Sequence, residues 1–242
     1  MMKKLLPLLL AVGLTPCLRA QDGPTPYPSS PDDWPGRGPI RTFKYMTDNR
    51  NSFWTRRNED QRAIVLVGDS LMAGKKWQAL EDALPNEHVV SRGIGGDTSR
   101  GLLFRFKEDV LDLNPKAVVI LIGTNDLSAH GKPADTISNI TEMIRQAHEQ
   151  NPNLPLIVCT IPPRDNPKSP TQPGKLEELN SQILALGSDK VRILDLHALL
   201  ALPDGKPNPE FFGEDKLHLA PPAYGTFSAE IKKLLQEMKV VE

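Results

Sequence analysis

The sequence has little cysteine, few aromatic residues and almost no net charge. Cys17 and Cys159 are the two cysteines of the 242 residues. Cys17 lies in a leader-like N-terminal segment, and Cys159 lies in the apolar run "LIVCTI", where a cysteine is usually a small core residue. Removal of the leader leaves one cysteine, so the sequence predicts neither an intramolecular disulfide nor a cysteine-based metal site.

Other absences narrow the class of protein. The formal net charge of -1 gives no electrostatic reason to bind nucleic acid or an anionic membrane surface. The phosphate-loop pattern G-x-x-x-x-G-K-[ST] does not occur. The longest N-terminal apolar run is shorter than the roughly 20 residues that cross a bilayer, so no transmembrane span is expected in the mature protein.

The first 20 residues have the pattern of an export signal. "MMKK" is a basic start, "LLPLLLAVGL" an apolar core and "TPCLRA" a small-residue end. We predict a signal peptide over residues 1–20 and a secreted or periplasmic mature protein. A buried helix is the alternative, which Pro7 disfavours. Cys17 also permits a lipoprotein anchor, although Pro16 matches that signal poorly.

Residues 21–58 form a predicted Pro-rich N-terminal extension before a domain at 59–242. Its first part, "QDGPTPYPSSPDDWPGRGP", has no hydrophobic period and suggests an extended tether, with packing on the domain as the alternative. The following "RTFKYMTDNRNSFWTRR" carries several aromatic residues, and we expect one helix or turn there that packs on the domain.

From residue 63 onward, apolar runs alternate with helical stripes. The runs predicted as strands are 63–68, 88–94, 117–123, 154–162 and 191–197. The stripes predict five helices, of which the last begins at Pro221-Pro222. In chain order, the residues on their inner faces are Trp77, Leu80 and Leu84; Leu102, Leu103, Phe106 and Val110; Ile137, Ile140, Ile144 and Ala147; Leu176, Leu179, Ile183 and Leu186; and Tyr224, Phe227, Ile231, Leu234 and Met238. This alternation predicts an α/β fold, a three-layer α/β/α sandwich with a five-stranded parallel sheet.

Functional groups of such sheets gather outside the carboxyl ends of the strands. The first strand ends in Gly68-Asp69-Ser70, the second in "RGIGGDTS" and the third in "GTNDLS", while "EDKLHLAPPAY" precedes the last helix. Each segment has an ordinary explanation. Ser70 can cap the next helix, and the glycines can serve only to form a tight turn. Asn125 can be a turn residue and His218 a surface histidine.

Together the four segments supply the parts of a serine hydrolase. A serine hydroxyl needs a base to remove its proton, and that base needs a third group to orient it. His218 can be the base for Ser70, and Asp215, three residues before it, can be the group that orients the imidazole. Backbone N–H groups of Ser70 and of the glycine turn, with the Asn125 amide, are the donor types that stabilise an oxyanion.

The sequence resembles the GDSL or SGNH hydrolase family in four blocks that appear in family order. These are "GDSL" (68–71), "RGIGGDTS" (92–99), "GTND" (123–126) and "DKLH" (215–218). "GIGGDT" (93–98) and the "DKLHL" tail (215–219) are especially similar to the platelet-activating-factor acetylhydrolase catalytic subunit branch. The resemblance implies the family's flavodoxin-like SGNH-hydrolase fold, with no cofactor and no metal. It implies Ser70 as nucleophile, His218 as base, Asp215 as its orienter, and Ser70, Gly96 and Asn125 as the oxyanion hole.

Other histidines and acids leave alternatives open. His88, His130, His148 and His197 compete as the base, with His197 placed at the end of the fifth strand. Asp69, Asp97 and Asp126 also lie at strand ends, where they indicate either a hydrolytic metal site or, as we favour, loop-ordering bonds to backbone N–H groups.

We therefore expect an exported serine esterase that hydrolyses acetyl or other short acyl esters, with carbohydrates as the favoured acceptors. Its partner is a small-molecule, glycan or lipid ester substrate. The alternatives are a lysophospholipase or thioesterase acting on longer acyl chains, a non-catalytic carbohydrate-binding relative, and a metal-dependent phosphodiesterase.

Overall fold

Five parallel strands form the centre of the protein. The computed structural model describes residues 22–242, so the predicted signal peptide and Cys17 lie outside the described residues. The strands are β1 (Ile64–Gly68), β2 (Val89–Ser91), β3 (Ala117–Leu121), β4 (Leu156–Cys159) and β5 (Val191–Leu194). Each overlaps a predicted strand, but β2, β3, β4 and β5 all end before the predicted residue, because the chain leaves the sheet early at their carboxyl ends.

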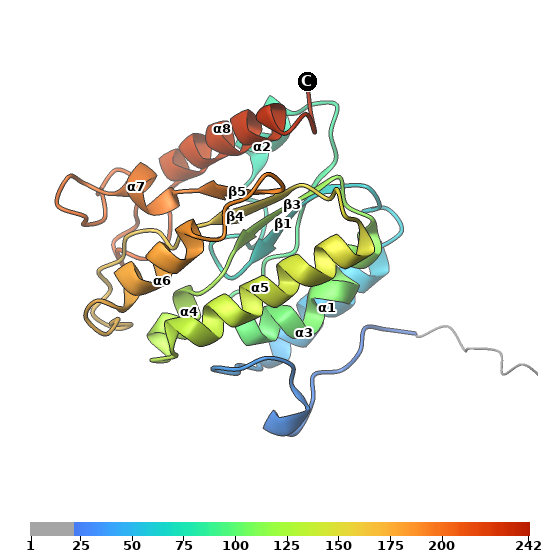
Figure 1. The fold of residues 1–242 in the computed structure, drawn as a ribbon, viewed down its shortest axis with the longest axis horizontal. Coiled ribbons are helices and arrows are strands. Elements are labelled where there is room, and N and C mark those ends of the chain that lie inside the picture. The colour runs from blue at the N-terminus through green and yellow to red at the C-terminus, as the bar shows by residue number, and fades with distance from the viewer. Residues whose placement is uncertain (1–21) are drawn as a thin grey trace, which may run out of the picture.

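Helices cover both faces of the sheet, which confirms the predicted three-layer sandwich (Figure 1). On one face lie α2 (Gln78–Ala83) and α8 (Pro221–Glu237). On the other lie α1 (Lys44–Arg56), α3 (Ser99–Asp109), α5 (Pro133–Gln150) and α6 (Lys175–Leu184). The shorter elements are α4 (Thr124–Ser128), α7 (Leu196–Leu200) and one-turn 3₁₀ helices at Pro31–Asp33 and Leu111–Leu113. His197 thus lies in α7, not at the end of a strand as predicted, because β5 stops at Leu194.

The strand order β2-β1-β3-β4-β5 places β1 and β3 side by side. After β1 the chain crosses to β2 on one side, and after β2 it returns to β3 on the other. This reversal is the switch point at which flavodoxin-like sheets hold their ligands. The segments after β1 and β3, which contain Ser70 and Asn125, therefore meet at the same crevice.

The strands are apolar on both faces because helices cover both faces. Every residue of β1, β3 and β4 is buried. Between the sheet and α8, the Trp77 ring packs edge-on against Tyr224 and Phe227. Cys159 is buried in this core at the end of β4, in agreement with the prediction that it is a core residue.

The N-terminal extension packs on the domain, which decides between the two alternatives. The Tyr27 ring stacks on Trp34, and both rings contact Phe104 of α3. Arg100 of α3 donates hydrogen bonds to the backbone carbonyls of Pro31, Trp34 and Pro35. Because proline has no backbone N–H, this proline-rich segment cannot form a regular hydrogen-bond ladder of its own. The Arg100 side chain instead donates hydrogen bonds to its carbonyls. The expected helix before the domain is α1.

Glu108 of α3 binds the extension at a second point. Its carboxylate accepts hydrogen bonds from the Thr25 N–H and from the buried guanidinium of Arg50 in α1.

Between residues 22 and 242, no helix combines the length and the apolar character that a bilayer crossing requires.

Gly68 ends β1 at a place where no side chain fits. Its φ is +157°, and a Cβ built there would lie 1.9 Å from the Leu121 carbonyl oxygen of β3. Since that oxygen belongs to the neighbouring strand, relief of the clash requires the two central strands to move apart. The glycine therefore lets β1 and β3 stay adjacent directly below Ser70.

We expect Gly68→Ala to lower the free energy of unfolding by about 2–5 kcal/mol, because it adds both a backbone clash and a strained φ. Urea denaturation measures this change. Gly225→Ala is the matched control: Gly225 lies in α8 with nothing within 4 Å of a built Cβ. There alanine should raise stability by about 0.5–1 kcal/mol through its helix propensity. Equal effects at both positions would contradict this account.

Candidate active site

Ser70 lies in a turn directly after β1. The Asp69 carboxylate accepts a hydrogen bond from the Leu71 N–H, and the Asp69 carbonyl accepts one from the Met72 N–H. This turn diverts the chain, and the next helix, α2, begins only at Gln78. The alternative that Ser70 caps the next helix is therefore wrong, because Asp69 occupies the capping geometry in a turn of its own. No helix dipole acts at Ser70.

The structure brings Ser70, His218 and Asp215 into one hydrogen-bonded line. The Ser70 Oγ lies 3.0 Å from His218 Nε2, and His218 Nδ1 lies 2.5 Å from Asp215 Oδ2. The two loop side chains are open to solvent, with 47% of His218 and 41% of Asp215 exposed. This is the order of groups in which an imidazole removes a serine proton while a carboxylate fixes its tautomer.

The loop that carries His218 and Asp215 is closed by its own backbone. Gly213 N–H donates to the His218 carbonyl, and Phe212 bridges to Leu219. Asp215 Oδ1 accepts the N–H groups of Leu217 and His218. Partial burial acts to raise the pKa of Asp215, but hydrogen bonds from the His218 side chain and from these two N–H groups hold it below its ordinary value. Asp215 thus stays ionised beside the imidazole.

The glycine turn lies against the serine. A Cβ built on Gly95 would lie 3.8 Å from the Ser70 Cβ. Gly96 has a φ of +76°, a left-handed conformation that glycine adopts without strain. Within residues 22–242, the N–H groups of Ser70 and Gly96 have no acceptor in the chain, so both are available to an oxyanion.

Asn125, in the first turn of α4, is tied to the same turn. Its Nδ2 donates to the Asp97 carbonyl at 2.9 Å, and its Oδ1 accepts from Arg41 Nη1 at 2.9 Å. An amide nitrogen carries two hydrogens, so the second N–H of Asn125 is left for a ligand. The three predicted oxyanion donors therefore border one region beside Ser70.

Three cationic side chains border this region, and sequence reasoning missed all of them. Lys76 Nζ donates to the Ser70 carbonyl at 3.1 Å, Arg41 to Asn125, and Arg164 Nη1 to the Thr124 carbonyl at 2.7 Å. Burial and the nearby charge of Arg41 lower the pKa of Arg164, while Asp69 raises it. Lysine and arginine in loops form no periodic pattern, so no signal in the sequence marks these contacts.

Arg105 of α3 is fully buried beneath the site. Its Nη2 donates to the Gly68 carbonyl, its Nε to Asp97 at 2.8 Å, and its Nη1 to the Arg92 carbonyl and to Asp109. One guanidinium thus joins the strand before Ser70 to the glycine turn. A signal did exist: Arg105 lies three residues after Leu102, on the stripe that the sequence assigns to the core.

The carboxylates of the strand ends order loops, as favoured in the sequence. Asp97 accepts the Thr98 N–H, and Asp126 accepts the N–H and hydroxyl of Ser99. In the described part of the chain, no three His, Cys, Asp or Glu side chains are grouped to hold a metal ion.

Asp69 has the fewest hydrogen bonds of these three buried acids. It is fully buried, and its Oδ2 has no hydrogen-bond partner among the described residues. Burial, with the negative charges of Asp97 and Asp126, raises the pKa of Asp69 to about 7, although the Leu71 N–H and His218 oppose this rise.

The competing histidines make no hydrogen bond to Ser70 in the described part of the chain. His148 Nε2 contacts the Leu154 carbonyl, and the His197 backbone N–H donates to Thr160. His130 lies just after α4 with a φ of +57°. His88 does have a carboxylate partner, since its Nε2 lies 3.1 Å from Asp60. The ring that contacts Ser70 Oγ is that of His218.

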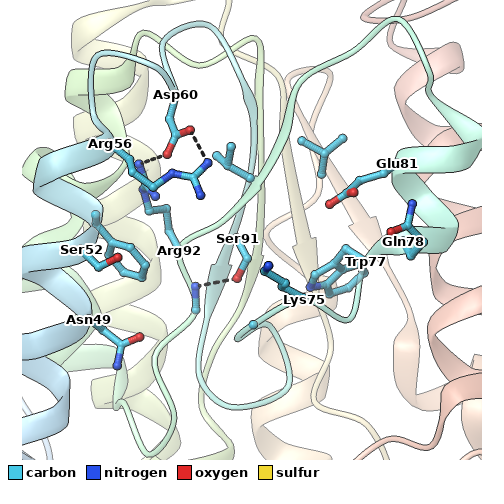
Figure 2. A pocket seen from close by; sticks show the side chains of 15 residues that line it. Asn49, Ser52, Arg56, Asp60, Lys75, Trp77, Gln78, Glu81, Ser91 and Arg92 are labelled. Atoms are coloured by element: carbon cyan, nitrogen blue, oxygen red, sulfur yellow. Dashed lines mark hydrogen bonds and ion pairs between the residues drawn. The ribbon is translucent and has the colours of Figure 1, made fainter.

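A polar cavity of about 420 Å³ lies between α1 and α2 beside the edge strand β2 (Figure 2). On its wall the buried Asp60 accepts hydrogen bonds from Arg56 and Arg92. Burial acts to raise the pKa of Asp60, but Arg92 and the hydrogen bonds from His88 and Arg56 hold it below its ordinary value. The lining includes none of the predicted site residues.

Comparison with known proteins agrees with this geometry. Residues 66–225 match the model of the GDSL-like Lipase/Acylhydrolase family. Platelet-activating factor acetylhydrolase IB subunit alpha2 of Rattus norvegicus is 28% identical over 182 residues, which are 72% of this chain and 76% of the rat protein. The family match spans all four sequence blocks, from the strand before Ser70 to the helix after His218.

Solved structures share the fold. A GDSL-like lipase from Bacteroides thetaiotaomicron is 25% identical with a TM-score of 0.66, over 80% of this chain and 96% of that one. An acetyl xylan esterase, AlAXEase, is 21% identical with a TM-score of 0.59, over 71% of this chain and 100% of that one. The likeness to the second is one of fold alone.

Arg105→Met should lower the free energy of unfolding by about 3–5 kcal/mol, because it leaves the buried Asp97 carboxylate without its cation and removes one of the two arginines that pair with Asp109. Chemical denaturation at neutral pH measures the loss. Arg145→Met is the control, since Arg145 pairs with Glu142 and Glu149 on an exposed helix face. Its cost should stay below about 1 kcal/mol. Similar losses for both variants would argue against the role given to Arg105.

Asp69→Asn should become more stable relative to the wild type as pH rises. The unfolded pKa of about 3.9 lies below the folded value of about 7. The folded wild type therefore keeps a proton that the unfolded chain loses, and its stability falls as pH rises through this window. Asparagine removes this dependence. Between pH 5 and pH 8 the variant should gain on the order of 2 kcal/mol over the wild type.

Urea denaturation of both proteins at the two pH values measures this difference. Asp189→Asn, at an exposed position, should show no such gain. A difference between Asp69→Asn and the wild type that does not change with pH would mean that Asp69 is ionised throughout the range.

Proposed function

We propose that this chain, which belongs to the GDSL-like lipase/acylhydrolase family, is an exported serine esterase that removes acetyl or other short acyl groups from carbohydrates. Family membership implies hydrolysis of acyl esters. The observation that carries the finer proposal is the line from Ser70 Oγ through the His218 ring to Asp215.

The proposed reaction has two steps. His218 Nε2 takes the hydroxyl proton as Ser70 Oγ attacks the acyl carbonyl, and Asp215 stabilises the imidazolium that results. The tetrahedral oxyanion accepts hydrogen bonds from the N–H groups of Ser70 and Gly96 and from Asn125. Collapse of this intermediate expels the alcohol, which takes the proton from His218, and leaves the acyl group on Ser70.

A water molecule then replaces the alcohol. His218 removes its proton, hydroxide attacks the acyl-serine, and the second tetrahedral intermediate releases the carboxylic acid while Ser70 Oγ regains its proton. Each proton thus leaves and returns through one imidazole nitrogen. The reaction needs only the side chains already described.

Polar surroundings of the serine favour a short acyl group. Lys76 contacts the Ser70 backbone, Arg41 contacts the Asn125 side chain, and Arg164 contacts the backbone of the neighbouring Thr124. Burial of a long alkyl chain against such groups strips them of water without giving them partners, which opposes binding. The names of the rat acetylhydrolase and of the acetyl xylan esterase support acetyl esters as the first substrates to test.

A carbohydrate acceptor is supported by the rim of the site. Phe43 and Tyr45 stack on each other beside Gly96 and are 50% and 45% exposed. Exposed aromatic faces offer apolar area to a ring while a polar edge stays in water. His218 and Asp215 are also open to solvent, so a polymer does not need to enter a deep cavity. Export, which the first 20 residues suggest, would bring the enzyme to such polymers.

A longer acyl chain is the second candidate. A groove of about 460 Å³ borders the His218 loop at Gly213, Glu214 and Lys216, and its apolar wall includes Leu202 and Phe212. An alkyl chain in this groove would cover apolar surface and gain free energy for each methylene that is buried.

Ser70→Ala should lower kcat/KM for p-nitrophenyl acetate by about 10³-fold or more, because it removes the attacking oxygen. Ser181→Ala, an exposed serine of α6, should keep the wild-type rate. A fluorophosphonate probe should label the wild type and Ser181→Ala but not Ser70→Ala. An unlabelled wild type would point to a non-catalytic carbohydrate-binding protein.

A panel of p-nitrophenyl esters and acetylated sugars decides the substrate class. We expect kcat/KM to be highest for acetyl esters and to fall with chain length, and we expect acetylated oligosaccharides to be better substrates than simple acetyl esters. A preference for dodecanoyl esters would instead support the second candidate.

A further inference from the structure

The segment from Pro39 to Tyr45 lies outside the predicted hydrolase domain, yet it forms one side of the oxyanion region. The Pro39 carbonyl accepts a hydrogen bond from Thr98 Oγ1 at 2.9 Å, just beyond the glycine turn. At the other end, the Tyr45 hydroxyl donates to the Gly95 carbonyl at 3.0 Å. Both ends of the segment are therefore fixed to the loop that contains Gly96.

Arg41 lies between these two anchors and is partly buried. Its Nη1 donates to Asn125 Oδ1 at 2.9 Å, across 84 positions of sequence. A hydrogen bond from a guanidinium to an amide oxygen is charge-assisted and stronger than a neutral one. Since the Asp97 carbonyl takes one N–H of the same amide, Arg41 and Asp97 together fix the orientation of the Asn125 amide and leave its second N–H for a substrate oxygen.

The hydrogen bond from Arg41 changes the donor strength of the Asn125 N–H as well as its orientation. Chains of hydrogen bonds polarise one another, so a cation on the amide oxygen makes the amide N–H a stronger donor. This benefit grows as negative charge develops on the substrate oxygen, and it is therefore larger in the transition state than in the ground state. Interactions of that kind raise kcat with little effect on KM.

We propose that Arg41 is a positioning residue for the oxyanion hole and that it acts through Asn125. The N-terminal segment thereby supplies a part of the active site that the hydrolase domain alone lacks. This inference rests on the proposed serine esterase function, and it assigns Arg41 no direct contact with substrate.

Arg41→Met should lower kcat for p-nitrophenyl acetate about ten- to hundredfold and leave KM nearly unchanged, a share of the 10²–10³-fold that one oxyanion donor contributes. Arg41→Lys, which keeps a charged donor, should recover part of kcat. Added guanidinium chloride at low millimolar concentration should raise kcat of Arg41→Met and not that of the wild type.

Arg37→Met is the matched control. Arg37 lies in the same extension and is exposed, so its loss removes the same charge without touching Asn125. It should keep the wild-type kcat and KM. Thermal unfolding of both variants shows whether each is folded at the assay temperature. If Arg41→Met is not folded, Arg41→Gln decides, because it keeps a neutral donor and should lower kcat by several fold.

Two results would overturn the inference. One is a kcat for Arg41→Met, or for Arg41→Gln in its place, equal to that of the wild type. The other is a rise in KM with kcat unchanged, which would make Arg41 a substrate-binding residue. Failure of the proposed function looks different: the wild type itself would then lack esterase activity, or Ser70→Ala would retain it.

Discussion

The buried guanidinium of Arg105 is the contact on which the geometry of the site depends. It bonds the Gly68 carbonyl at the end of β1 and the Asp97 carboxylate in the glycine turn, so two loops from different strands share one rigid cation. A buried ion pair adds little net stability, because desolvation of the charges offsets their attraction. Its effect here is positional: Ser70 and Gly96 are each a few residues from an atom that Arg105 holds.

The charges around this cation are arranged in layers. Asp69, Asp97 and Asp126 lie buried under the strand ends, while Lys76, Arg41 and Arg164 border the crevice above them. Negative charge that develops on a substrate oxygen would thus form on the cationic side. Asp69 lies directly before Ser70, and its pKa of about 7 means that its carboxyl is partly protonated at neutral pH, which lessens its repulsion of that charge.

The sequence could predict what depends on local pattern. Buried parallel strands are near-continuous apolar runs, so the sheet and the strand-end position of Ser70 and Asn125 followed directly from the letters. The relation of Asp215 to His218 is a spacing of three, which is also local. The alternative of Ser70 as a helix cap was wrong because the Asp69 side chain, and not the apolar stripe that follows, determines the turn after β1. Arg41 could not be predicted, since its partner is 84 positions away and its segment has no period.

The N-terminal extension is therefore more than a covering of the domain. Its aromatic pair, Tyr27 and Trp34, and the ion pair of Arg50 with Glu108 fix it to α3, the same helix that carries Arg105. α3 also begins directly after the glycine turn that contains Gly96. The same helix therefore fixes the position of the extension relative to the proposed oxyanion donors. Arg41 can reach Asn125 only while that attachment persists. If Ser70 is the nucleophile as proposed, binding of the extension to α3 and the reaction at Ser70 are coupled through this one helix.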